Sequence, residues 1–101
     1  MNEILCLLHP TRPEMVDAPT DAETAAVRAH FQHLQAHLAR GTVRVAGRTD
    51  GGRDTFGIVV YRAAPHAEAV ALAHDDPAVR AGVMTAQTFP FRTALIEGDT
   101  P

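Results

Sequence analysis

The sequence predicts a single α+β domain over residues 1–101, with four antiparallel strands in one sheet and two helices covering one face of that sheet. The length of 101 residues allows one modest hydrophobic core and is too short for two. Apolar residues make up 46% and charged residues 21%, which is typical of a globular domain and excludes a disordered chain. Runs with strand and helix periodicity follow one another in the order β-α-β-β-α-β.

The first strand and the first helix have clear boundaries. The apolar run Ile4–Leu8 predicts a strand that is buried on both faces, and the prolines after it end the strand. Thr20 and Glu23 form a Thr-x-x-Glu capping box, so a helix is expected over residues 21–40, ending at Gly41. The spacing of its apolar residues predicts a core-facing stripe: Val27, Phe31, Leu34 and Leu38.

The second half of the chain predicts a hairpin, a second helix and a last strand. Residues 42–47 and 56–61 are expected to pair as strands across a glycine-rich turn at residues 50–53. Pro65 opens a helix that runs to about Ala73. A short helical turn follows at residues 77–82, and the last strand starts near Val83, with Pro90 favouring a sheet edge or a bulge. This order is the split βαβ, or ferredoxin-like, arrangement.

One face of the predicted sheet has no helix to cover it. That face is expected to carry apolar residues of the hairpin such as Val43, Val45, Ile58 and Val60, or their alternates. Nothing else in the chain is expected to cover this apolar surface. We therefore expect a homodimer that packs sheet against sheet.

Composition and charge argue against several classes of function. The net charge of -3 and a pI near 6.0 do not suit binding to nucleic acid. No apolar run is long enough to span a membrane and no secretory signal opens the chain, so a cytoplasmic location and no membrane partner are expected. The sequence contains no Ser, and its one cysteine, Cys6, lies in the apolar first strand, which gives little support to nucleophilic catalysis. No Gly-rich loop precedes a helix, so no nucleotide cofactor is expected.

Three histidines lie beside the apolar stripe of the first helix: His30, His33 and His37. His33 and His37, four residues apart, have the spacing of a metal-chelating pair. There is no Glu between them and no accompanying Cys, and partly exposed histidines in an Ala-rich helix are usually solvated or packed on a neighbour. No metal site is therefore expected. General acid–base chemistry remains, because a carboxylate can orient an imidazole for proton transfer.

Several segments carry a resemblance to a known family. They are the apolar first strand, the helix ending at Gly41, the Gly-x-apolar-Ala-Gly pattern of residues 41–47, the Asp-Pro segment of residues 76–83, and Pro90-Phe91. On these residues the whole chain resembles the YciI-like, or YCII-related, family of small dimeric α/β-barrel proteins. The resemblance implies an active-site pair formed by a histidine of the first helix and the aspartate of the Asp-Pro segment.

Carried over to this sequence, that pair is His30 and Asp76. The family's histidine lies eleven residues before the glycine that ends the helix, which selects His30. His33-Leu34 imitates the family's His-Leu at another spacing, so His33 is a second candidate. The chain departs from the family pattern at three positions, which suggests a different substrate: Val27 stands where Arg is common, Phe31 where Leu is common, and Arg48 where Pro is common.

The predicted topology agrees with the pair that the resemblance implies. In a split βαβ fold the first helix and the segment after the second helix lie on one side of the sheet, so His30 is expected to contact Asp76. Asp76 is also expected to cap the turn that starts at Pro77. Arg48 is expected to bind an anionic group of a substrate, with His33 and His9 at the rim of the pocket. Each of these three also has a plainer interpretation, as an exposed arginine, a solvated histidine or a loop residue.

The sequence therefore predicts a small-molecule enzyme of lyase or isomerase type, with His30 and Asp76 as a general acid–base pair and no cofactor. A small anionic or aromatic molecule is the expected ligand. The alternative is a non-catalytic module of the same fold that binds a small ligand or another protein.

Overall fold

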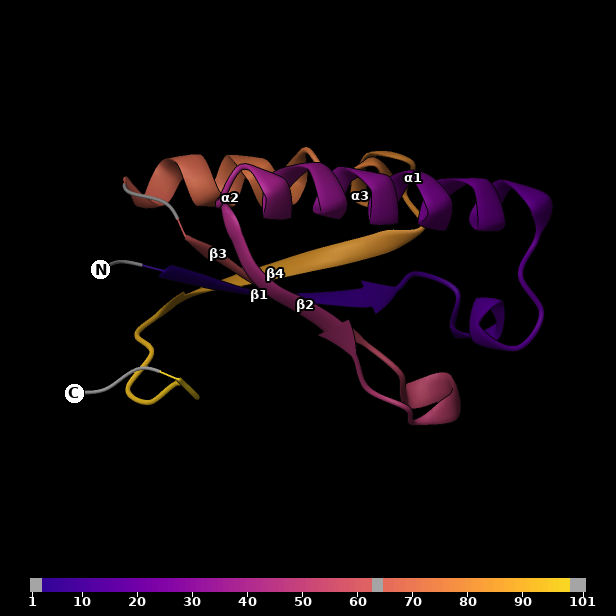
Figure 1. Ribbon diagram of the computed structural model, residues 1–101. Coiled ribbons are helices and arrows are strands. Elements are labelled where there is room, and N and C mark those ends of the chain that lie inside the picture. Colours follow the sequence, from indigo (N-terminus) through magenta and orange to yellow (C-terminus); the bar gives the residue numbers. More distant parts are fainter. Residues whose placement is uncertain (1–2, 63–64, 99–101) are drawn as a thin grey trace.

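The computed structural model describes residues 3–62 and 65–98, which form one four-stranded antiparallel sheet with helices on one side (Figure 1). The strands lie in the order β2-β3-β1-β4, which is the ferredoxin-like arrangement that the sequence predicts. The elements are β1 (Glu3–Pro10), η1 (Pro13–Val16), α1 (Asp21–Ala39), β2 (Val43–Arg48), η2 (Gly52–Asp54), β3 (Gly57–Arg62), α2 (His66–His74), α3 (Pro77–Arg80) and β4 (Met84–Phe91).

The boundaries of α1 follow from local chemistry. The capping box is present, since the Thr20 side chain accepts from the Glu23 amide and the Glu23 carboxylate accepts from the Thr20 amide. At the other end Gly41 has a φ of 81°, a conformation that glycine adopts without strain. The predicted limits of the helix therefore agree with the structure to within one residue.

Strand alternation divides the sheet into a helix-facing side and an open side. On β1, Ile4, Cys6 and Leu8 are buried beneath the helices, while Leu5 and Leu7 face the other way and are half-buried. Pro90 pairs with Ile4 inside β4, an edge strand, where a missing amide donor is tolerated.

A bulge in β2 corrects one sequence expectation about the open side. Val43 pairs with Tyr61 and Val45 with Val60, so the register shifts between the two valines. Tyr61 and Val60 lie on opposite faces of β3. Val43 is consequently buried on the helix-facing side. Of the two valines, Val45 alone is on the open side, where it is 56% exposed.

The open side is also not entirely bare. The segment after β4 lies below one end of the sheet, on the side opposite the helices (Figure 1). The Thr93 amide and hydroxyl both donate to Glu3, whose carboxylate also pairs with Arg44 at 2.7 Å. The expectation that nothing in the chain covers this side was therefore wrong for the end near Glu3. Val45 and Phe89 remain exposed farther along the sheet.

The apolar stripe of α1 differs from its prediction. Leu34 is buried, but Val27, Phe31 and Leu38 are 36%, 60% and 55% exposed. The helix packs mainly on α3 and β2, the strand at the edge of the sheet, so most of its stripe does not reach the central strands. Within the described residues, no helix is both long and apolar enough to cross a membrane.

Candidate active site

His30 and Asp76 are in direct contact. The His30 Nδ1 atom lies 2.5 Å from the Asp76 Oδ2 atom, although 46 residues separate the two in the chain. An ionised carboxylate only accepts hydrogen bonds, so Nδ1 carries the proton of this bond. The other ring nitrogen, Nε2, then has its lone pair free in the neutral imidazole.

The position of Asp76 is fixed by the start of α3. Its Oδ1 atom accepts from the Ala78 amide at 2.9 Å, which makes Asp76 the N-cap of this short helix. Pro77 occupies the first helical position, where its fixed φ suits the helix and no amide donor is needed. One carboxylate oxygen therefore caps the helix and the other holds the histidine.

The pair sits at the edge of the buried core. The Asp76 side chain is fully buried and the His30 side chain is 14% exposed. Burial raises the pKa of the Cys6 thiol to about 11, with the negative charge of Asp76 adding to the effect. Burial likewise raises the pKa of Tyr61, with contributions from Cys6 and Asp76. Cys6 is therefore a protonated core residue.

His30 lines a cavity of about 760 Å³ between α1 and the helix-facing side of the sheet. Most of the lining is apolar, and it includes the stripe residues Val27, Phe31, Leu34 and Leu38. This cavity explains why the stripe is exposed, since these side chains face a hollow instead of packed strands. A large apolar cavity with a few polar groups is the usual form of a small-molecule site.

A clamp, formed by the ion pair of Arg12 with Glu23, lies at the end of the cavity where α1 begins. Arg12 donates to both carboxylate oxygens of Glu23, at 2.7 and 3.0 Å, and to the Ala18 carbonyl at 2.8 Å. The Arg12 guanidinium and the Thr20 amide lower the pKa of Glu23 to about 2. The clamp fixes the loop that carries η1, and two residues of η1, Met15 and Val16, line the cavity.

The sequence match to a family model covers most of this architecture. The model of the YCII-related domain matches residues 4–92, a span that includes both members of the His30–Asp76 pair. The chain belongs to the YCII-related family. No curated protein matches the sequence of this YCII-related chain significantly.

A solved structure has the same fold. The chain is similar to 5-chloro-2-hydroxyhydroquinone dehydrochlorinase from Burkholderia phenoliruptrix, solved in complex with 2,5-dihydroxybenzoquinone. The TM-score is 0.62 at 18% sequence identity, and the alignment covers 96% of this chain and 99% of that one. At this level of identity the likeness shows a shared fold.

The other site residues predicted from the YCII-related sequence fall in different places. Arg48 lines the cavity together with His30. His33 and His9 are not among the described residues that line it. The His33 ring packs against His37 at 4.6 Å, and the His9 ring stacks on Phe56 at 5.3 Å. The structure thus brings His30, which is bonded to Asp76, and Arg48 to one cavity. The catalytic roles of the pair and the binding role of Arg48 remain predictions.

Several lining residues of the YCII-related domain were missed from the sequence because they lie in loops. Met15 and Val16 come from η1, and Thr55 and Phe56 come from the end of the β2–β3 connection. Apolar side chains in a loop flanked by prolines, such as Met15 and Val16, are a signal that could have been followed. No such pattern in the sequence indicates that Arg12 pairs with Glu23.

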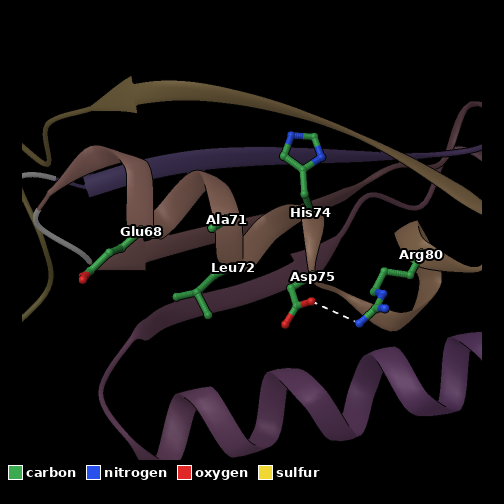
Figure 2. Close-up of a pocket in the computed structure, with 6 residues that line it drawn as sticks. All are labelled: Glu68, Ala71, Leu72, His74, Asp75 and Arg80. Carbon is green, nitrogen blue, oxygen red and sulfur yellow. Dashed lines mark hydrogen bonds and ion pairs between the residues drawn. The ribbon is translucent and has the colours of Figure 1, made fainter.

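A second hollow, of about 540 Å³, lies beside α2 (Figure 2). None of its described lining residues lines the His30 cavity. Its lining includes an ion pair between Arg80 and Asp75 at 3.3 Å, from which His74 points away (Figure 2). Both partners of this pair are largely exposed, so it adds little stability. Within the described ranges, no group of three or more His, Cys, Asp or Glu side chains is placed to hold a metal ion.

Proposed function

We propose that the protein is a small-molecule enzyme of lyase or isomerase type in which His30 and Asp76 act as a general acid–base pair. The observation that carries the proposal is the 2.5 Å contact between His30 Nδ1 and the buried Asp76 carboxylate, beside a large apolar cavity. A buried carboxylate fixes the tautomer and the orientation of the imidazole, which leaves Nε2 available for a proton of the substrate.

The proposed step is a proton abstraction from carbon. His30 Nε2 takes the proton, and Asp76 stabilises the imidazolium that forms. In a lyase reaction the C–H electron pair forms a new C=C bond while a leaving group departs from the adjacent carbon with its bonding pair. In an isomerase reaction the proton returns from Nε2 to another carbon of the conjugated substrate. Both reactions balance without an oxidant or a reductant.

The structural neighbour supports the same type of chemistry. That protein is named a dehydrochlorinase, which is an activity of lyase type, and its complex holds a small cyclic quinone. Together with the shared fold, this makes an enzyme more consistent with the site than a non-catalytic module. The site is also more consistent with a small molecule than with a protein partner. The cavity is concave, and an imidazole held in one orientation by a buried carboxylate is not needed for protein–protein contact.

We further propose that a second copy of this chain covers the open side of the sheet. Leu5, Leu7 and Ile58 are only half-buried there, and Val45 and Phe89 are 56% and 43% exposed. An exposed apolar surface of this kind, on a sheet face that no helix covers, is suited to sheet-on-sheet packing. The helix-facing cavity lies on the other side of the sheet, so such a dimer leaves it accessible.

Isotope exchange tests the enzymatic proposal without knowledge of the natural substrate. The purified protein is incubated in deuterium oxide with a panel of cyclic ketones, enol lactones and halogenated carbon acids. Mass spectrometry then reports deuterium uptake or loss of a leaving group. Turnover of a compound by the unaltered protein that disappears in His30→Gln, but persists in His66→Gln on the exposed start of α2, is the expected result. Turnover that persists in His30→Gln would overturn the proposal.

A further inference from the structure

The His30 cavity is elongated along α1. Lining residues of this helix extend from Glu23 to Leu38, a distance of about 22 Å at a rise of 1.5 Å per residue. His30 lies near the middle of this length. A ligand that fills the cavity is therefore longer than one ring, and different parts of it lie on either side of the catalytic histidine.

The walls of the cavity offer an apolar ligand a large contact area. Val27, Phe31 and Leu38 project from α1, and Leu8, Val43 and Met84 contribute from the sheet. The three helix residues are at least 36% exposed, so their apolar surface meets water until a ligand covers it. Covering such surface is the main source of affinity for an apolar molecule.

Two of the polar side chains that line the cavity already form hydrogen bonds within the protein. Glu23 is bonded to Arg12 and to the Thr20 amide, and the Thr55 hydroxyl accepts from the Gly51 amide at 3.1 Å. Besides His30 and Arg48, only Thr24 and Gln35 among the described lining residues then offer polar side chains to a ligand, so a molecule rich in hydroxyl groups would leave several of them unpaired, which costs free energy. The lining therefore selects against polar ligands.

Arg48 is the one cationic Lys or Arg side chain among the described lining residues. It follows the Ala46-Gly47 pair at the end of β2, and its nearest ionic partner is Asp50 at 3.9 Å. Both side chains are largely exposed, and an exposed pair at this separation contributes little, so the guanidinium is available to an anion of the ligand.

We propose that the cavity binds an elongated, largely apolar molecule that carries one anionic group, and that Arg48 binds this group. The inference deepens the proposed function, because the same cavity holds His30. The anion at Arg48 fixes one end of the substrate, the apolar walls hold its body, and an acidic C–H lies at His30. Arg48 is then a residue that determines substrate specificity.

Two fluorescent probes of matched shape test the inference. Anilinonaphthalene sulfonate carries one anionic group, and phenylnaphthylamine has the same aromatic frame without it. Both are titrated into the unaltered protein and into Arg48→Gln. Loss of a charge-assisted bond is expected to weaken the sulfonate probe about tenfold and to leave the neutral probe within about twofold.

Control variants separate a direct contact from other effects. Arg53→Gln, which removes the same charge from the same hairpin outside the lining, is expected to leave both probes unchanged. Val27→Trp, which fills the cavity, is expected to weaken both probes. Val45→Lys reports on the open side of the sheet and is expected to weaken neither. Equal effects of Arg48→Gln and Arg53→Gln, or loss of binding in Val45→Lys, would overturn the inference.

The length of a ligand's hydrocarbon chain provides a second test of the inference. Linear carboxylates that displace the sulfonate probe are expected to compete more strongly from butyrate to dodecanoate, since each buried methylene adds to affinity. Equal competition by butyrate and dodecanoate would contradict an elongated apolar site. The probe titrations do not depend on turnover, so failure of the catalytic proposal, seen as turnover that persists in His30→Gln, is distinguishable from failure of this one.

Discussion

The Asp76 carboxylate bonds to His30 through one oxygen and caps α3 through the other. Both bonds are made by a side chain with no exposed surface. The start of α3 therefore holds the carboxylate still, and the carboxylate holds the imidazole of α1. A change that keeps the cap but removes the negative charge separates these two roles.

Asp76→Asn is such a change. The Asn Oδ1 atom can still accept from the Ala78 amide, while its amide group donates to His30 Nδ1 and moves the imidazole proton to Nε2. We expect the nitrogen chemical shifts of the His30 ring to show protonated Nδ1 in the unaltered protein and protonated Nε2 in the variant. The ring of His37, which contacts the Thr42 hydroxyl at 2.9 Å, is the internal control and should not change. An unchanged His30 tautomer would show that Asp76 does not set it.

Glu23 makes the stability of the fold sensitive to acid. Its pKa is about 2 in the folded protein, against 4.5 for the free side chain, so its contribution to stability is complete above pH 4.5. This contribution declines below pH 4.5 and is lost as the pH falls through about 2. We expect the free energy of unfolding, measured by urea denaturation, to decline over this range less steeply in Glu23→Gln than in the unaltered protein. Glu68→Gln, on an exposed part of α2, should retain the steeper decline.

The Thr20 cap contributes to the same end of α1. Thr20→Ala removes the hydroxyl that accepts from the Glu23 amide at 3.1 Å, and we expect it to cost about 1 kcal/mol of stability. Thr24→Ala, at an exposed position one turn farther along α1, is the control for loss of a threonine hydroxyl. A Thr20→Ala variant as stable as Thr24→Ala would contradict the role of the cap.

Core and cavity residues should differ in their effect on stability. Ile4 is 1% exposed in β1 and does not line the cavity, and Ile4→Ala is expected to cost about 2–5 kcal/mol. Phe31 is 60% exposed, and Phe31→Ala is expected to cost less than about 1 kcal/mol while weakening the binding of the apolar probes. Equal costs for the two variants in urea denaturation would place Phe31 in the core.

The proposed dimer has a direct test in solution. The chain has a mass of 10.8 kDa, and light scattering coupled to size exclusion is expected to give twice this value. Introducing Val45→Lys and Phe89→Lys together places charges on the open side of the sheet and is expected to give the single-chain mass. Ala25→Lys, on the exposed surface of α1, should remain a dimer. A single-chain mass for the unaltered protein would refute the dimer.

Local signals made the fold predictable. The capping box at Thr20 and Glu23, the glycine at position 41 and the order of periodic segments each depend on neighbouring residues, and all agree with the structure. The contact between His30 and Asp76 was expected from the family resemblance, which selects this pair, and the split βαβ arrangement agrees with it because their segments lie on one side of the sheet. Its catalytic role remains a prediction.

The sequence predictions were wrong where they rested on hydrophobic periodicity alone. Val27, Phe31 and Leu38 form an apolar stripe whether α1 packs on the sheet or borders a cavity, so the pattern could not tell a core from a binding site. The bulge that separates Val43 from Val45 has no local signature in the strand, and it moved Val43 to the helix-facing side. The bond from Thr93 to Glu3 joins residues 90 positions apart and is equally invisible to local patterns.

A double-mutant cycle on proton exchange tests the catalytic pair most directly. The rate of deuterium uptake by a responsive compound is measured for the unaltered protein, His30→Gln, Asp76→Asn and the double variant. Loss of the general base is expected to slow uptake by about 10²–10⁴-fold in His30→Gln. Adding Asp76→Asn should slow it little further, because Asp76 acts through the imidazole. Full activity in His30→Gln, or strictly additive losses in the double variant, would contradict the pair.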